Sequence, residues 1–87
     1  MAWQVEFSRQ ALDNLRDLDR PVASRALRRT RWLADNFESL TPEALSGELR
    51  GLFKLRIGSY RALYSFDARN QIITIHAVAH RREIYQE

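Results

Sequence analysis

After a short first stretch, the hydrophobic pattern of the chain changes from a period of about 3.6 residues to a period of two. Up to Asn36, apolar residues recur at helical spacing on two segments that Asp19-Arg20-Pro21 separates. From Phe53 onward, apolar and polar residues alternate, as they do along strands that bury one face. The change predicts a helical half followed by a sheet, and these two layers together form an α+β domain.

The expected elements follow from this pattern. Residues 3–7 alternate and predict a short first strand. Two helices are expected over about 9–17 and up to about 36, forming an antiparallel hairpin, with Ser8 as the N-cap of the first. Three strands of an antiparallel meander should then occupy these ranges: 53–57, 60–66 and 71–78. The first strand must pair within this sheet, because alone it would expose its backbone groups.

The order β-α-α-β-β-β predicts an α+β sandwich with both helices on one face of an antiparallel sheet. The connecting chain at Thr41-Pro42-Glu43 resembles a helix start, with an N-cap, a proline and an acid in the first turn. One short helical turn is therefore expected there. With 87 residues, the chain is expected to form a single domain over 1–87.

The composition narrows the possible functions. The sequence has no cysteine, which excludes disulfides, thiolate metal sites and thiol catalysis. No signal peptide is visible, and no apolar run approaches the ~20 residues of a membrane helix. The two histidines have no spaced carboxylate set, so no metal site is expected. We expect a cytoplasmic protein without a membrane partner.

Positive charge is concentrated in the second half of the chain. Thirteen of the 14 basic residues are arginine, whose planar fork suits phosphate. Between Arg50 and Arg82 only Asp67 is acidic, against seven basic residues. This charge indicates an anionic partner, either nucleic acid or an acidic protein segment, although a solvated basic face is an equal alternative.

Strand alternation predicts where these charges lie. Phe53, Leu55 and Ile57 share one face, so Lys54 and Arg56 share the other. The same rule puts Ile73, Ile75 and Ala77 toward the helices. The helix-free face should then gather the following residues: Lys54, Arg56, Arg61 and His76, with Val78 beside them and His80, Arg81 and Tyr85 at the edge. Like charges on neighbouring strands repel, and a bound anion would relieve that repulsion.

Three stretches together resemble the RelE/ParE superfamily of toxins from type II toxin–antitoxin systems, and the tail is closest to the RelE branch. They are Glu48-Leu-Arg-Gly51, the hairpin from Lys54 to Tyr64, and Ala79-His-Arg-Arg-Glu-Ile-Tyr85. The resemblance implies a ribosome-dependent endoribonuclease that cuts mRNA in the A site without a metal or cofactor. The ribose 2′-OH would attack the adjacent phosphate.

The resemblance also implies roles for particular residues. Lys54 would lie near the 2′-OH as base or charge stabiliser, and Arg61 would bind the scissile phosphate. Arg81 would be the general acid or a second phosphate clamp, and Tyr85 would stack on a base. His80, whose side-chain type titrates near neutrality, is a further candidate for acid–base work. Three more arginines would bind RNA phosphates: Arg50, Arg56 and Arg82.

One position departs from the RelE pattern, and several alternatives stay open. The pattern has a second lysine where this chain has Leu52, which concerns the proton-abstraction step. The implied partners are a cognate antitoxin, mRNA, and the ribosome with its 16S rRNA at the A site. The alternatives are a ParE-like inhibitor of DNA gyrase and a catalytically degenerate module that binds only the antitoxin.

Overall fold

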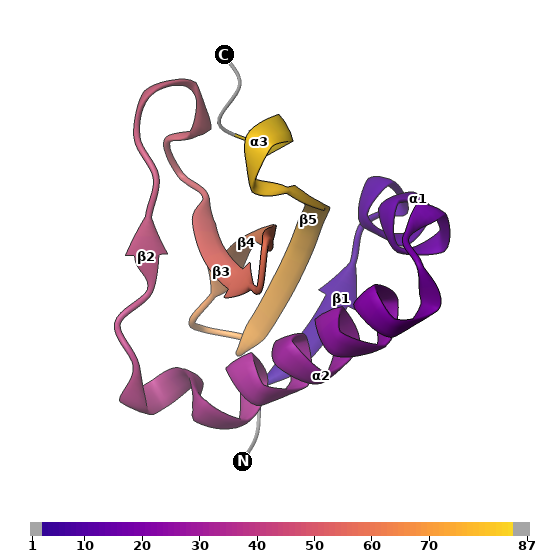
Figure 1. Ribbon diagram of the computed structural model, residues 1–87. Coiled ribbons are helices and arrows are strands. Elements are labelled where there is room, and N and C mark those ends of the chain that lie inside the picture. Colours follow the sequence, from indigo (N-terminus) through magenta and orange to yellow (C-terminus); the bar gives the residue numbers. More distant parts are fainter. Residues whose placement is uncertain (1–2, 85–87) are drawn as a thin grey trace.

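The chain folds into a five-stranded sheet with two helices packed against one of its faces (Figure 1). The computed structural model describes residues 3–84. Its elements are β1 (Gln4–Phe7), α1 (Arg9–Asp17), α2 (Arg20–Asn36), a 3-10 turn (Phe37–Ser39), β2 (Glu43–Ala44), a second 3-10 turn (Gly47–Leu49), β3 (Phe53–Ile57), β4 (Tyr60–Asp67), β5 (Ile72–His80) and α3 (Arg81–Ile84). The predicted α+β order is confirmed.

The strand order is β1-β5-β4-β3-β2. Three neighbouring pairs are antiparallel, but β1 runs parallel to β5. The expectation of a purely antiparallel sheet was therefore wrong. The parallel pairing is possible because the two helices carry the chain across the sheet between β1 and the meander. In the described part of the chain, no helix has the length and apolar character needed to cross a membrane.

The segment around Pro42 is also different from the expectation. It forms the edge strand β2 in place of a helical turn, and Glu43 and Ala44 pair with Lys54 and Phe53. Proline holds its own φ near the value of a helix start, but it pushes the preceding residue toward extended chain. The free edge of β3 supplies hydrogen-bond partners, so this segment adopts an extended conformation and not a helical turn.

Aromatic rings fill the core between α2 and the sheet. Phe37 lies 4.6 Å from Trp3 and 4.9 Å from Phe66, measured between ring centroids, and Phe53 stacks on Tyr64 at 5.7 Å. The largest fully buried side chains are Leu33, Ile57, Tyr64, Ile73 and Ile75. Trp3 is buried, whereas Trp32 is 42% exposed on α2.

Beyond the end of β1, the start of helix α1 lies along the edge of β5. The hydroxyl of Ser8 donates to the carbonyl of His76 at 3.0 Å and accepts the N–H of Ala11 at 3.1 Å, so Ser8 is the predicted N-cap. One helical turn further along, Oδ1 of Asn14 accepts the N–H of Val78 at 3.0 Å. Two side chains of the helix thus replace the missing ladder partners.

A β-bulge in β5 changes the predicted parity. Leu63 pairs with Ala77, but the next residue of β4 pairs with Ile75, so His76 is an extra residue. Beyond the bulge, the faces are exchanged. Val78 is 2% exposed in the core, and His80 pairs with Tyr60 on the side of α1. The expected orientations of Ala77, Val78 and His80 were therefore wrong.

Candidate functional site

Three basic side chains lie on the sheet face opposite α1 and α2, which we call the cationic face. Lys54 and Arg56 alternate with core residues along β3, and Arg61 is the direct cross-strand partner of Arg56. This agrees with the parity expected from the sequence. Two guanidinium groups on paired positions repel each other, so an anion placed between them would be stabilised.

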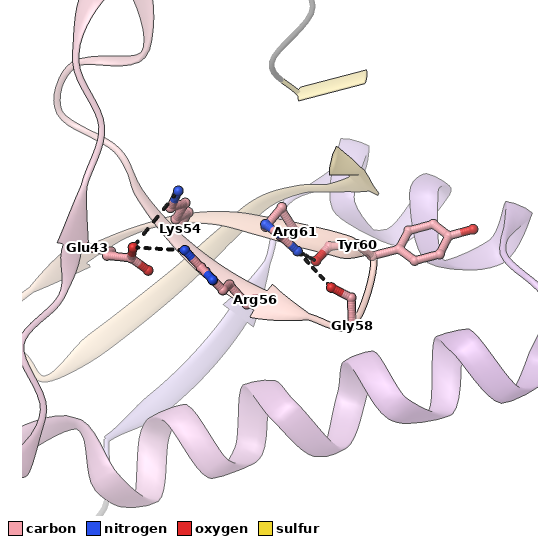
Figure 2. Close-up of polar contacts among 6 residues, drawn as sticks. All are labelled: Glu43, Lys54, Arg56, Gly58, Tyr60 and Arg61. Carbon is pink, nitrogen blue, oxygen red and sulfur yellow. Dashed lines mark hydrogen bonds and ion pairs between the residues drawn. The ribbon is translucent and has the colours of Figure 1, made fainter. Parts of the chain in front are cut away.

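A carboxylate on β2 joins this face. Oε2 of Glu43 lies 3.9 Å from Nζ of Lys54 and 3.7 Å from Nη2 of Arg56, as Figure 2 shows. The sequence interpretation missed Glu43 because it placed residues 41–43 in a helical turn away from the sheet. The Arg56 pair is exposed on both sides and contributes only ~0.2–1 kcal/mol, whereas the Lys54 side chain is only 18% exposed. The main effect of the two ion pairs is to hold a proton-accepting oxygen against two cations.

Arg61 is the buried cation of the site. It is 8% exposed, and its Nη1 donates to the carbonyls of Gly58 and Tyr60, both at 2.8 Å (Figure 2). Within residues 3–84 its buried Nε has no hydrogen-bond partner, and no carboxylate pairs with it. Asp67, the single acidic residue between Arg50 and Arg82, instead accepts bonds from Arg69 and Asn70. A buried guanidinium with an unused donor is suited to a bound anion.

The start of α3 is attached to the same turn. The N–H of Arg81 donates to the carbonyl of Ser59 at 2.9 Å, which brings Arg81 to the turn that Arg61 contacts. Both Arg81 and Arg82 are exposed. Arg50 is exposed after the Gly47–Leu49 turn, and in the described part of the chain its side chain makes no hydrogen bond or ion pair with the other candidates. Tyr85 lies outside the described residues.

The two histidines have different surroundings. The rings of His80 and Tyr60 are arranged edge to face with their centroids 5.3 Å apart, beside Asn14 and Asp17 of α1, and Nδ1 of His80 accepts the N–H of Arg82 at 3.2 Å. His80 therefore caps α3 and does not lie on the cationic face. His76 does, because its Nε2 is 2.8 Å from the hydroxyl of Ser65, a residue opposite the core.

A pocket of about 210 Å³ lies between α2, the 40–52 segment and β3. Glu43, Lys54 and Arg56 form part of its wall, and Tyr64 lies at its inner side. Burial of the hydroxyl and, second, the negative charge of Glu43 raise the pKa of Tyr64 to about 12, so this phenol is neutral at physiological pH. Among residues 3–84, no group of three or more acidic or histidine side chains could hold a metal ion.

Over nearly its whole length, the chain is similar to a known protein family and to several solved structures. The family model for the ParE toxin of the type II toxin–antitoxin system parDE matches residues 5–85. The toxin–antitoxin complex RelBE2 from Mycobacterium tuberculosis contains a chain that is 27% identical, with a TM-score of 0.83 over 93% of both chains. The archaeal RelE–RelB complex from Pyrococcus horikoshii OT3 is 23% identical, with a TM-score of 0.73 over 93% of this chain and 97% of that one.

A mutant of the Escherichia coli toxin RelE in the free state is 20% identical, with a TM-score of 0.73 over 99% of this chain and 90% of that one. At this identity the likeness concerns the fold alone. No curated protein matches the sequence.

Proposed function

Since the chain belongs to the ParE toxin family, within the RelE/ParE superfamily of type II toxin–antitoxin systems, we propose that it is a ribosome-dependent endoribonuclease that cleaves mRNA in the A site. The observation that supports this best is the buried Arg61, whose unpartnered Nε lies on a face with Lys54 and Arg56. A toxin that only blocks a protein target has no need of a buried, incompletely bonded cation among other cations.

The proposed reaction is attack of a ribose 2′-oxygen on the neighbouring phosphorus. The bond from the 2′-oxygen to phosphorus forms and the bond to the 5′-oxygen breaks, leaving a 2′,3′-cyclic phosphate and a 5′-hydroxyl. The 2′-hydroxyl loses a proton, and the 5′-oxygen gains one. The phosphorane between these states carries more negative charge than the substrate, so fixed cations stabilise it preferentially.

Each cation has a separate task in this scheme. Arg61 binds the scissile phosphate through the part of its guanidinium that the turn leaves unused, because the carbonyls of Gly58 and Tyr60 already occupy its Nη1. Lys54 stabilises the developing charge near the 2′-oxygen, and Arg56 holds the adjacent phosphate. Arg81 acts as a second phosphate clamp, since an arginine is a poor proton donor at neutral pH. Tyr85, Arg50 and Arg82 keep the roles that the resemblance implies, as predictions.

The proton-abstraction step needs an acceptor, and Leu52 stands where the RelE pattern has a second lysine. We assign this role to Glu43, whose carboxylate contacts both Lys54 and Arg56. A carboxylate held by two cations beside the attacking hydroxyl meets the geometric requirement for a general base. His80 caps α3 and faces α1, so its proposed contribution is to position Arg81, with acid–base work by His80 as the alternative.

The proposed partners are a cognate antitoxin, mRNA and the ribosome, including 16S rRNA, in the cytoplasm. The chains in the M. tuberculosis and P. horikoshii complexes are toxins bound to their antitoxins, which supports an antitoxin for this toxin as well. Binding to ribosomal RNA should weaken steeply with salt, because each phosphate contact releases counterions.

Primer extension on a translated mRNA tests the proposal. Induction of the wild-type toxin should produce new 5′ ends inside A-site codons. Arg61→Ala should abolish them, whereas Arg69→Ala, which removes an exposed arginine in the β4–β5 loop, should not. Thermal unfolding of both variants controls for the lost turn contacts. Intact mRNA in cells arrested by the wild-type toxin would refute the cleavage proposal.

Glu43→Gln separates chemistry from binding in the same assay. The substitution removes a negative charge from the cationic face, so RNA should bind at least as tightly while the single-turnover rate falls by ~10²-fold or more. An unchanged rate would reject Glu43 as the base.

A second candidate function is inhibition of DNA gyrase. It is favoured by one observation, namely that the matching family model is that of the ParE toxin. Growth arrest with accumulated DNA breaks and intact mRNA would support it.

A further inference from the structure

We propose that the pocket beside Trp32 binds one unpaired nucleobase of a single-stranded RNA whose phosphates lie on the cationic face. This inference rests on the proposed function and adds a base-binding subsite to it. The stacking residues of the subsite, Trp32 and Arg29, lie on α2, which supplies none of the residues placed in the reaction above.

Trp32 is held in position for stacking. Its side chain is 42% exposed, and the guanidinium of Arg29 lies 4.4 Å from the centre of its ring. Nε of Arg29 also donates to the carbonyl of Arg56 at 3.2 Å, which ties the pair to strand β3. An exposed indole with a fixed guanidinium beside it provides the stacking surfaces that unpaired bases use.

The pocket connects this pair to the reaction site. Its lining includes Trp32 and Arg29 of α2 together with Glu43 of β2 and Lys54 and Arg56 of β3. A nucleotide therefore has a place for both of its parts, with the flat base against Trp32 and the phosphate at the cations. Leu40 and Pro42 add apolar wall, which suits the faces of a base, while the charged groups suit its polar edges.

The arrangement of α2 favours a base over an apolar helix of a protein partner. The other large exposed apolar residue of α2 is Leu27. At ~100° per residue, it lies about 140° around the helix axis from Trp32. By the same geometry, the charged residues Arg28, Arg31 and Asp35 lie between the two on the helix surface, and together they line one pocket. Trp32 is thus not part of a continuous apolar stripe, which a docked amphipathic helix needs.

The test uses single-stranded RNA octamers with 2′-O-methyl riboses, which cannot be cleaved, at low ionic strength without ribosomes. Binding should quench indole fluorescence. Trp32 is responsible for that quenching, because Trp3 is only 9% exposed and packs on Phe37 and Phe66. Trp32→Leu should remove the quenching and weaken binding about 5- to 150-fold. Trp32→Phe should keep most of the affinity, and Leu27→Ala on the opposite flank should keep all of it.

An abasic nucleotide moved along the octamer identifies the stacked base. One position should reproduce the loss seen with Trp32→Leu, and the two changes together should cost no more than either alone. Wild-type affinity in Trp32→Leu, or equal effects at all abasic positions, would overturn the proposal. So would a Trp32→Leu variant that loses affinity for the purified antitoxin but not for the octamer, since that result would assign Trp32 to a protein interface.

The assay needs neither ribosome nor cleavage. Its result therefore tests the base-binding subsite independently of the proposed cleavage of mRNA. A wild-type toxin that stacks the octamer but leaves translated mRNA intact would refute cleavage and keep the subsite. If the Trp32→Leu variant cleaves mRNA at the wild-type rate and binds the octamer with wild-type affinity, the subsite is refuted and the cleavage proposal stands.

Discussion

Tyr64 reports on two features at once, the depth of the core and the position of Glu43. Its side chain is 1% exposed, and its pKa is raised from 10.0 to about 12, first by burial and second by the charge of Glu43. At 1.36 kcal/mol per pKa unit, this rise corresponds to roughly 2–3 kcal/mol of preference for the protonated phenol in the folded protein.

The sign of the pH effect follows from the direction of this shift. The folded state holds the Tyr64 proton more tightly than the unfolded state does. The resulting stability is complete below pH 10 and is lost as the pH rises through about 12. Over this window, the free energy of unfolding should fall by roughly 2–3 kcal/mol from this residue alone, a large part of the ~5–15 kcal/mol typical of a domain.

Urea denaturation of the wild type and of Tyr64→Phe, followed by circular dichroism over this range of pH, measures the effect. Phenylalanine keeps the ring packing against Phe53 but has no proton to lose. The difference in unfolding free energy between the two proteins should therefore shrink or reverse as the pH rises, because all other groups titrate in both. A difference independent of pH would show that the Tyr64 hydroxyl reaches water and would refute the deduced burial.

Glu43→Gln then tests the position of β2. With tyrosine carrying carbon-13 in its ring, NMR gives the pKa of Tyr64 directly, and the Tyr64→Phe spectrum assigns the signal. The pKa should fall, by less than half of the total rise, because burial is the larger cause. An unchanged pKa would mean that the 40–52 segment does not bring Glu43 to the cationic face.

Two further predictions concern the contacts that hold β5 and α3. Asn14→Ala leaves the buried N–H of Val78 without an acceptor and should lower the free energy of unfolding in urea by ~1–3 kcal/mol. The exposed Asp13→Ala should stay within ~0.5 kcal/mol, and equal losses would reject the contact. His80→Asn keeps an acceptor near the position of Nδ1, whereas His80→Gln does not. The Arg82 amide should therefore exchange hydrogen faster in the glutamine variant, and equal rates would reject the cap.

Local sequence signals predicted most of the fold. The bounds of β3 and the cap of α1 came directly from alternation and from Ser8, because both depend on neighbours in sequence. The pairing of strands across the sheet does not depend on neighbours in sequence. Strand β2 is two residues long and has no period to recognise, and the parallel pairing of β1 is decided by helices that lie between the partners. Contacts between distant segments made these choices.

The same division applies to the candidate site. Alternation placed Lys54, Arg56 and Arg61 on one face because each strand is regular there. It missed Glu43, which reaches the face through the unrecognised strand β2. It also put His80 on the wrong face, since a bulge adds a residue without any change in composition.

The bulge at His76 decides which residues of β5 can act on an anion. With regular parity, His76, Val78 and His80 would share the cationic face, and α3 would start from an uncapped strand. The extra residue instead buries Val78 in the core and turns His80 to cap α3. Ser8 binds the carbonyl of His76 and Ser65 contacts its ring, so the insertion is fixed from both faces of the sheet. Arg81 begins where this shifted strand ends, and its place beside the Ser59 turn therefore depends on one inserted residue five positions earlier.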